Sequence, residues 1–331
     1  MEGQTQGREV RFASGPVILG GWLQLPPEGV DPWGTVIFLH GAGPQDRDGN
    51  APGAVINLFP ALAQDATEMG LAALRYDKRG VGSSSGETLS ADVHDLATDL
   101  HAAVRFARRV HETAGRPVFL LGHGEGSTLA LMEAATHPGD IAGLVLLAPA
   151  VRNMEEVLQM QSQAVQTAID ALRPDQRLQM GIPAGYSQLQ ATAQFIAAVR
   201  AAPADTPVLQ IMDQTVPVRW FRSHFDLDIA ALLPQVTCPV LAVAGAKDAQ
   251  VPPADAARLT ELVRAAGSDE APREASAVLI PDLTHILRRS SGTGDGSEYA
   301  ELAQQPLDAE LRERIREWLG AHQPHPATPT Q

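Results

Sequence analysis

The sequence predicts an α/β fold in which helices cover both faces of a mostly parallel β-sheet. Short apolar segments typical of buried strands alternate with longer segments whose apolar residues recur at helical spacing. Glycine-rich turns directly follow several of the predicted strands. The chain has 331 residues, 44% of them hydrophobic, which is enough for one large domain with an insertion.

The elements follow from the chain in order. Residues 10–12 and 17–25 flank a Ser-Gly-Pro turn and predict an antiparallel hairpin. Further strands are predicted at 35–39, 71–76, 118–121, 141–147, 239–244 and 277–280. Helices are predicted at 55–69, 90–110, 127–137, 253–266 and 307–319.

The alternation stops after Pro149, where the sequence becomes rich in Gln and Ala and shows no strand of the main sheet. We therefore predict a core of residues 8–149 and 235–320, with a helical cap at 150–234. Residues 321–331 have several prolines and no large apolar side chain, which predicts a disordered tail.

Composition excludes several classes of function. A net charge of −14 repels phosphate backbones, so we expect no nucleic-acid partner. The absence of a long apolar run or a secretory signal indicates a cytoplasmic protein without a membrane partner. The only cysteine, Cys238, precedes an apolar strand and is interpreted as a buried structural thiol. We expect neither a metal nor a cofactor.

The central segment is residues 118–131, which read as a buried strand, a glycine-rich turn and a helix. Gly122, Gly124 and Ser127 resemble a dinucleotide-binding fingerprint, but the next strand lacks the acidic residue that this fingerprint requires. Nucleotide binding is therefore disfavoured. A turn without chemistry remains an alternative on this segment alone.

Three motifs together resemble the α/β-hydrolase superfamily. The patterns H-G-x-G-P-x-D-R-D, R-Y-D-x-R-G-x-G-x-S and G-H-S-E-G, typical of its bacterial esterase-like branch with a helical cap, begin here at His40, Arg75 and Gly122. The resemblance covers about residues 10–319. It implies a carboxylesterase-like serine hydrolase that acts on small acyl esters or thioesters without a cofactor. Gly124, however, stands where the family has its nucleophilic serine.

The remaining catalytic residues come later in the chain, in the order that this fold uses. Asp248 follows a buried strand and is the candidate acid, and His285, in the loop after the last short strand, is the candidate base. The resemblance places the oxyanion-hole amides at Ala42 and Glu125. The other histidines receive no catalytic role: His94, His101 and His111 fit a solvated helix face, His137 ends a helix, and His224 is a weak second candidate for the base.

Asp46, Asp48 and Asn50 have the spacing of calcium ligands. The glycine and glutamate that a calcium loop needs are replaced by Ala51 and Asn57. We therefore predict that these side chains order their loop rather than bind an ion.

Three hypotheses follow from Gly124. Glycine should relieve the backbone strain of the nucleophile turn while removing the attacking oxygen. The chain could then be an inactive binding protein, a hydrolase in which His285 activates a water, or one in which Ser127 replaces the nucleophile. The last is disfavoured because Ser127 lies one helical turn beyond the tip.

Overall fold

The computed structural model describes residues 6–211 and 214–324 and divides into two compact units. Unit 1 comprises Met1–Thr88, Asp95–Val151 and Ile229–Gln331, and unit 2 comprises Leu89–His94 and Arg152–Asp228. The candidate catalytic residues all belong to unit 1. Of the predicted tail, residues 325–331 lie outside the described part of the chain. The prediction starts the tail too early, because Ala321 is the last residue of the C-terminal helix and His322 bonds to the Trp318 carbonyl oxygen.

Unit 1 is built around an eight-stranded sheet with the order β1-β2-β4-β3-β5-β6-β9-β10. Strands β1 and β2 form the predicted antiparallel hairpin, β2 is antiparallel to β4, and every later pairing is parallel. The mostly parallel α/β sheet is thus confirmed. The strands are β1 (Gln6–Ser14), β2 (Val17–Leu25), β3 (Thr35–Leu39), β4 (Ala72–Tyr76), β5 (Val118–His123), β6 (Gly143–Leu147), β9 (Val240–Gly245) and β10 (Ala275–Ile280).

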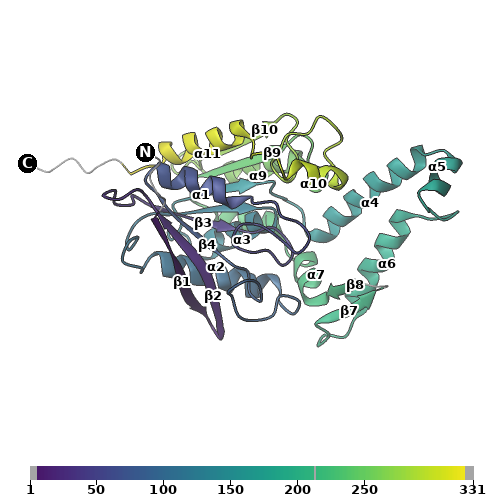
Figure 1. Ribbon diagram of the computed structural model, residues 1–331, viewed down its shortest axis with the longest axis horizontal. Coiled ribbons are helices and arrows are strands. Elements are labelled where there is room, and N and C mark those ends of the chain that lie inside the picture. Colours follow the sequence, from purple (N-terminus) through teal and green to yellow (C-terminus); the bar gives the residue numbers. More distant parts are fainter. Residues whose placement is uncertain (1–5, 212–213, 325–331) are drawn as a thin grey trace, which may run out of the picture. The chain divides into compact units, whose positions relative to one another are not determined.

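Helices cover both faces of this sheet (Figure 1). One hydrophobic cluster joins α1 and α11 to strand residues such as Phe38 and Phe119. The buried Leu120 and Leu144 alternate with cluster residues along their strands and therefore point to the opposite face of the sheet. The helices of unit 1 are α1 (Phe59–Glu68), α2 (Val93–Ala107), α3 (Glu125–Thr136), α8 (Ile229–Leu232), α9 (Ala254–Ala265), α10 (Tyr299–Leu302) and α11 (Ala309–Ala321), with 3-10 turns η1 (Leu233–Gln235) and η2 (Gly296–Glu298).

Unit 2 is mainly helical and has a small core of its own. Its members are α4 (Met154–Ala171), α5 (Pro174–Gln179), α6 (Gln188–Ala201), α7 (Val218–Phe225) and the strands β7 (Val208–Ile211) and β8 (Gln214–Pro217). Val199, Val218 and Phe225 are buried at its centre. The β7–β8 hairpin differs from the predicted all-helical insertion, because strands of four residues are too short to show a clear alternation.

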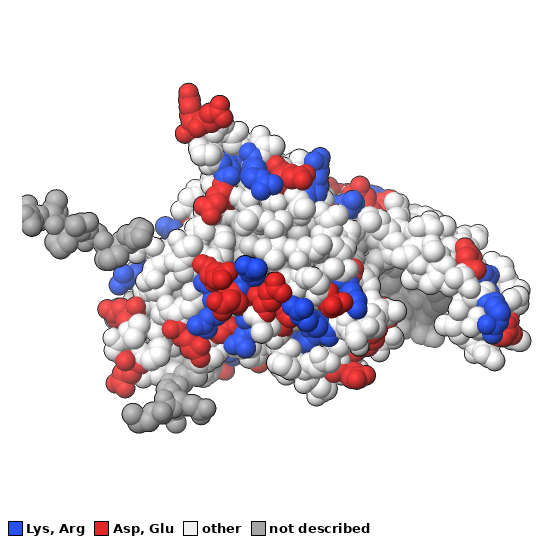
Figure 2. Space-filling view, turned by 90° about the horizontal axis from the view of Figure 1, so that it is seen from above, with Lys and Arg blue, Asp and Glu red and all other residues white. Residues whose placement is uncertain are grey.

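Charges of opposite sign alternate on the face of unit 1 seen from above in Figure 2. Asp65 of α1 is almost fully buried and accepts hydrogen bonds from Arg312 (2.7 Å) and Arg316 (3.0 Å) of α11. These bonds tie the first and last helices of the unit together. No helix among the described residues is long and apolar enough to cross a membrane.

Candidate active site

The turn at Gly124 is shorter than predicted. Strand β5 continues through His123 and α3 begins at Glu125, so Gly124 alone reverses the chain. Its backbone angles, φ 52° and ψ −114°, lie in a region that residues other than glycine rarely adopt. A strand, a one-residue strained turn and a helix form the setting of a nucleophile elbow.

Gly122 and Gly126 have a different reason to be glycine. A Cβ added to Gly122 would lie 2.3 Å from the carbonyl oxygen of Gly126. A Cβ added to Gly126 would lie 2.3 Å from the carbonyl oxygen of Leu39. At Gly124 the nearest atoms to such a Cβ lie 3.8 Å away. The flanking glycines are therefore fixed by close backbone approach, whereas position 124 has room for a side chain.

Asp248 and His285 form a buried hydrogen-bonded pair. His285 Nδ1 donates to Asp248 Oδ2 over 2.9 Å, and the other carboxylate oxygen accepts the backbone N–H groups of Gln250 (2.8 Å) and Val251 (2.9 Å). Burial raises the pKa of Asp248, but His285 and these N–H groups outweigh it and bring the pKa below its ordinary value. Asp248 thus stays ionised and fixes the imidazole with its Nε2 free to act as a base.

The loop that carries His285 is held in a strained, well-bonded conformation. Asp282 (φ 59°) and Leu287 (φ 60°) both have positive φ angles without being glycine. The backbone N–H of Thr284 and its hydroxyl both donate to the Arg288 carbonyl oxygen over 2.9 Å. The strain at two positions and this closed turn around His285 indicate a loop shaped to present one side chain.

His285 faces the turn at Gly124. A Cβ placed on Gly124 would lie 3.8 Å from both Cε1 and Nε2 of His285, and 3.9 Å from the Cα of Gly41. A hydroxyl one bond beyond that Cβ would be within hydrogen-bonding reach of Nε2. The structure thus brings together Gly124, Asp248 and His285, three residues widely separated in the sequence.

His123 supports this arrangement, a role that the sequence analysis missed. Its Nε2 donates to the His285 carbonyl oxygen over 2.9 Å, and the two rings lie 4.7 Å apart. Burial and the neighbouring His285 lower the pKa of His123 to about 3, so this imidazole is neutral at pH 7. His123 is thus a neutral donor that positions the backbone of His285.

Lys78, a second missed residue, joins the loop that carries Ala42 to Glu125, the two residues predicted to supply the oxyanion amides. Its ammonium donates to the carbonyl oxygens of Gly41 (2.7 Å) and Gly43 (2.9 Å), which flank Ala42, and to the Glu125 carboxylate (2.8 Å). Both charged side chains are buried. Because Glu125 is the first residue of α3, one cation holds the loop after β3 against the helix that follows Gly124.

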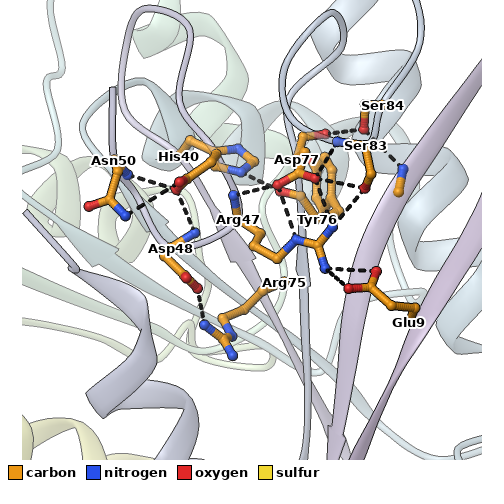
Figure 3. A network of polar contacts seen from close by, with 12 residues as sticks. Glu9, His40, Arg47, Asp48, Asn50, Arg75, Tyr76, Asp77, Ser83 and Ser84 are labelled. Atoms are coloured by element: carbon orange, nitrogen blue, oxygen red, sulfur yellow. Dashed lines mark hydrogen bonds and ion pairs between the residues drawn. The ribbon is translucent and has the colours of Figure 1, made fainter. Parts of the chain in front are cut away.

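A polar network extends from this point to the hairpin β1–β2 (Figure 3). The Arg47 side chain donates to Asp77 (2.8 Å) and to Glu9 (2.9 Å), and Asp77 also accepts from the backbone N–H (2.9 Å) and hydroxyl (2.8 Å) of Ser83. Burial raises the pKa of Asp77, but Arg47 and Ser83 outweigh it and lower the pKa to about 2. The loops after β3 and β4 are thus locked together.

The calcium-like spacing has the predicted ordering role. Asp46 accepts the backbone N–H groups of Asp48 and Asn50, each over 2.9 Å, and Asp48 forms an ion pair with Arg75. These carboxylates therefore bond to the protein's own donors.

The alternative residues have structural contacts. Ser127 is fully buried and its hydroxyl donates to the Gly122 carbonyl oxygen (2.8 Å), so it belongs to the packing of the turn. The buried His224 of unit 2 donates through Nδ1 to the Trp220 carbonyl oxygen (2.8 Å). Cys238 is half-buried, and burial raises the pKa of its thiol to about 11.

Comparison with known proteins identifies the family of the chain. Residues 31–287 match a family model described as serine aminopeptidase, S33. Esterase EstD of Thermotoga maritima is 25% identical over 296 residues, covering 88% of this chain and 63% of EstD. Monoglyceride lipase of Homo sapiens is 32% identical over 121 residues, covering 36% of each chain. The chain thus spans less than two thirds of the length of these relatives.

Solved esterase structures share the fold. The ferulic acid complex of Est1E from Butyrivibrio proteoclasticus superposes with a TM-score of 0.61 at 16% identity, covering 95% of this chain and 98% of Est1E. The esterase Pf2001 of Pyrococcus furiosus gives a TM-score of 0.57 at 14% identity, covering 96% of this chain and 90% of Pf2001. At these identities the likeness concerns the fold alone.

Proposed function

Since this chain belongs to the serine aminopeptidase S33 family of α/β hydrolases, we propose that it carries an esterase-type site for small acyl esters or thioesters whose nucleophilic position is occupied by Gly124. One observation carries the proposal: the Asp248–His285 pair is formed, and Nε2 of its imidazole lies 3.8 Å from the Cβ position of Gly124. The esterase and lipase relatives support this class of substrate.

The site is prepared for a covalent step that Gly124 cannot perform. In a serine hydrolase the base takes the hydroxyl proton while the oxygen attacks the ester carbonyl, and backbone N–H groups stabilise the resulting oxyanion. Asp248 and His285 provide the acid and the base, and Ala42 and Glu125 are the proposed sources of the N–H groups. Without a side-chain oxygen at residue 124, no acyl-enzyme forms there. We propose that the protein's main activity is to bind the acyl compound.

Slow hydrolysis by water is the second candidate, favoured by the intact orientation of His285. Nε2 would accept a proton from a water whose oxygen attacks the carbonyl carbon. The tetrahedral oxyanion would then collapse, expelling the alcohol as the imidazolium returns the proton to it. In serine proteases that lose a triad member, the oxyanion hole and binding still leave about 10³–10⁴-fold catalysis over water.

Hydrolysis of short-chain p-nitrophenyl esters tests the proposal. We expect Gly124→Ser to exceed the parent by at least about 10²-fold in kcat/KM. Removing the nucleophilic serine of subtilisin lowers kcat about 10⁶-fold. Restoring a serine at residue 124 should give only part of such a factor, because the surrounding side chains are not adjusted to the new hydroxyl. Gly124→Ala is the matched control, because it adds the Cβ without the oxygen, and it should stay at the level of the parent.

His285→Ala then separates the two candidates. If the parent has activity that His285→Ala removes, the protein is a slow water-dependent esterase. If the parent is inactive and Gly124→Ser is active, the pocket is intact and its function is something other than acyl-enzyme chemistry, which favours binding. A folded Gly124→Ser that is no faster than Gly124→Ala on any ester would refute the proposal, because the base and the oxyanion donors would then not be in place.

A further inference from the structure

Unit 1 holds a second cluster of ionisable side chains, two helical turns beyond the candidate active site along α3. His101 lies on α2, Glu133 in the last turn of α3, and His137 directly after that helix. One potential ligand atom from each residue, a ring nitrogen or a carboxylate oxygen, lies within 4.8 Å of the other two. We propose that these three residues form a binding site for a divalent ion of the zinc class, which links α2 to the end of α3.

The distances between the donor atoms are close to those that such an ion requires. Nδ1 of His101 lies 3.0 Å from one oxygen of Glu133, and Nδ1 of His137 lies 3.2 Å from the other. Zinc bonds of about 2.0–2.2 Å in tetrahedral geometry place neighbouring donors roughly 3.3–3.6 Å apart. A shift of a few tenths of an ångström therefore brings each nitrogen–oxygen pair to its coordinating distance.

Glu133 and His137 provide the reason for an ion at this place. The Glu133 carboxylate is 3% exposed, and a buried charge is costly unless it is paired or binds a metal. It accepts a hydrogen bond from Nδ1 of His101 over 3.0 Å, which an ion bound to both residues would replace. Nδ1 of His137 is also buried, yet its geometry toward Glu133 makes no hydrogen bond despite the short distance. An ion between them would neutralise the carboxylate and take up the lone pair of this nitrogen.

The imidazoles leave the ion a way in. The side chains of His101 and His137 are 30% and 35% exposed, so solvent reaches the cluster from one side. Their rings are stacked, with centroids 4.1 Å apart and planes 22° apart. Binding requires the rings to rotate until both Nδ1 lone pairs converge on the ion, which their exposure permits.

The donor set selects the metal. Two imidazole nitrogens and one carboxylate suit Zn²⁺, whereas Mg²⁺ and Ca²⁺ prefer oxygen ligands alone. Glu133 and His137 are four residues apart at the end of a helix, where such positions share a face. With three protein ligands, a water would fill the fourth position. Because the ligands come from α2 and from the end of α3, we expect the ion to stabilise the fold.

The test is zinc binding by untagged, chelator-stripped full-length protein, measured by calorimetry and by thermal unfolding. We expect one Zn²⁺ per chain, a raised melting temperature, and no comparable effect of Mg²⁺. Co²⁺ should give the intense visible absorption bands of a tetrahedral site. His137→Ala and His101→Ala should each raise the Kd at least tenfold and abolish those bands.

His322→Ala is the matched control. His322 is also half-buried and lies 3.3 Å from the carboxylate of Glu274, but it contacts a carbonyl oxygen rather than a second histidine. The His322→Ala variant should bind zinc with the same stoichiometry and affinity as the parent. Two results would overturn the proposal. One is less than one zinc per chain at about 100 µM free ion. The other is equal binding by His101→Ala, His137→Ala and the parent.

Discussion

The three glycines of the turn lead to a quantitative prediction about stability. Each is replaced by alanine, which adds the same single Cβ in three neighbouring places. Gly124→Ala acquires a side chain at φ 52° without a close contact, whereas Gly122→Ala and Gly126→Ala place a Cβ 2.3 Å from a backbone carbonyl oxygen. The series therefore separates backbone strain from steric overlap.

The expected costs differ clearly. A non-glycine residue in a sparsely populated backbone region costs about 1–3 kcal/mol, and Gly124→Ala should lose that much free energy of unfolding. At Gly126 the overlap is with the end of β3, a central strand that cannot move without disturbing its pairing on both sides. Overpacking a core whose side chains and backbone can shift costs about 1–3 kcal/mol. Overlap with fixed backbone should therefore cost more than about 3 kcal/mol.

Urea unfolding followed by circular dichroism measures these losses, and native near-ultraviolet spectra check that each variant folds. We expect Gly124→Ala to be the mildest of the three, with Gly124→Ser close to it. If Gly124→Ala lost as much stability as Gly126→Ala, position 124 would not have the room that the structure gives it. If it gained stability, the strain assigned to the turn would be wrong.

Three further predictions concern buried polar groups. Lys78→Met should lower the free energy of unfolding by about 3–5 kcal/mol, because it leaves the Glu125 carboxylate buried without its cation. The loss should be smaller when Lys78→Met is made in a protein that already carries Glu125→Gln, and equal losses with and without Glu125→Gln would contradict the pairing. Burial lowers the pKa of His40 to about 4 and that of His123 to about 3. Between these values and 6.5, the ordinary pKa of histidine, the two imidazoles are therefore protonated in the unfolded chain but not in the folded protein. Stability should therefore be independent of these groups above pH 6.5 and fall by up to about 1.4 kcal/mol per pH unit for each histidine down to pH 4.5; urea midpoints that fall equally steeply in His123→Asn would refute this. The thiol of Cys238, whose pKa is about 11, should react with a disulfide reagent at pH 8 much more slowly in the native protein than in guanidinium, and equal rates would show that it is open to solvent.

Most of the fold could be predicted because its strands are short, apolar and separated by clear turns. The hairpin β1–β2 and the parallel strands from β3 onward appear where the sequence placed them. Helix α1 starts at Phe59, later than expected, because Asn57 has a positive φ and Pro60 suits only the first turn of a helix. The β7–β8 hairpin was missed because four-residue strands carry too little periodicity.

The site could be predicted only in part, because contacts between distant residues do not show in a local pattern. Asp248 and His285 follow strands in an expected order, and the structure joins them. Lys78 occupies a variable position of its motif, and its partners lie 35 to 47 residues away in sequence. His101 and His137 each look unremarkable beside their helices, and only the folded chain places the His101 side chain beside the end of α3.

The bonds that hold the site avoid the side-chain position of residue 124. Lys78 joins backbone carbonyls to Glu125, His123 holds the backbone of His285, and Asp248 is fixed by main-chain N–H groups. Exchanging glycine for serine therefore changes none of these bonds. A scaffold held in this way accepts glycine or serine at position 124, so that two chains with the same supporting bonds can differ by this one residue.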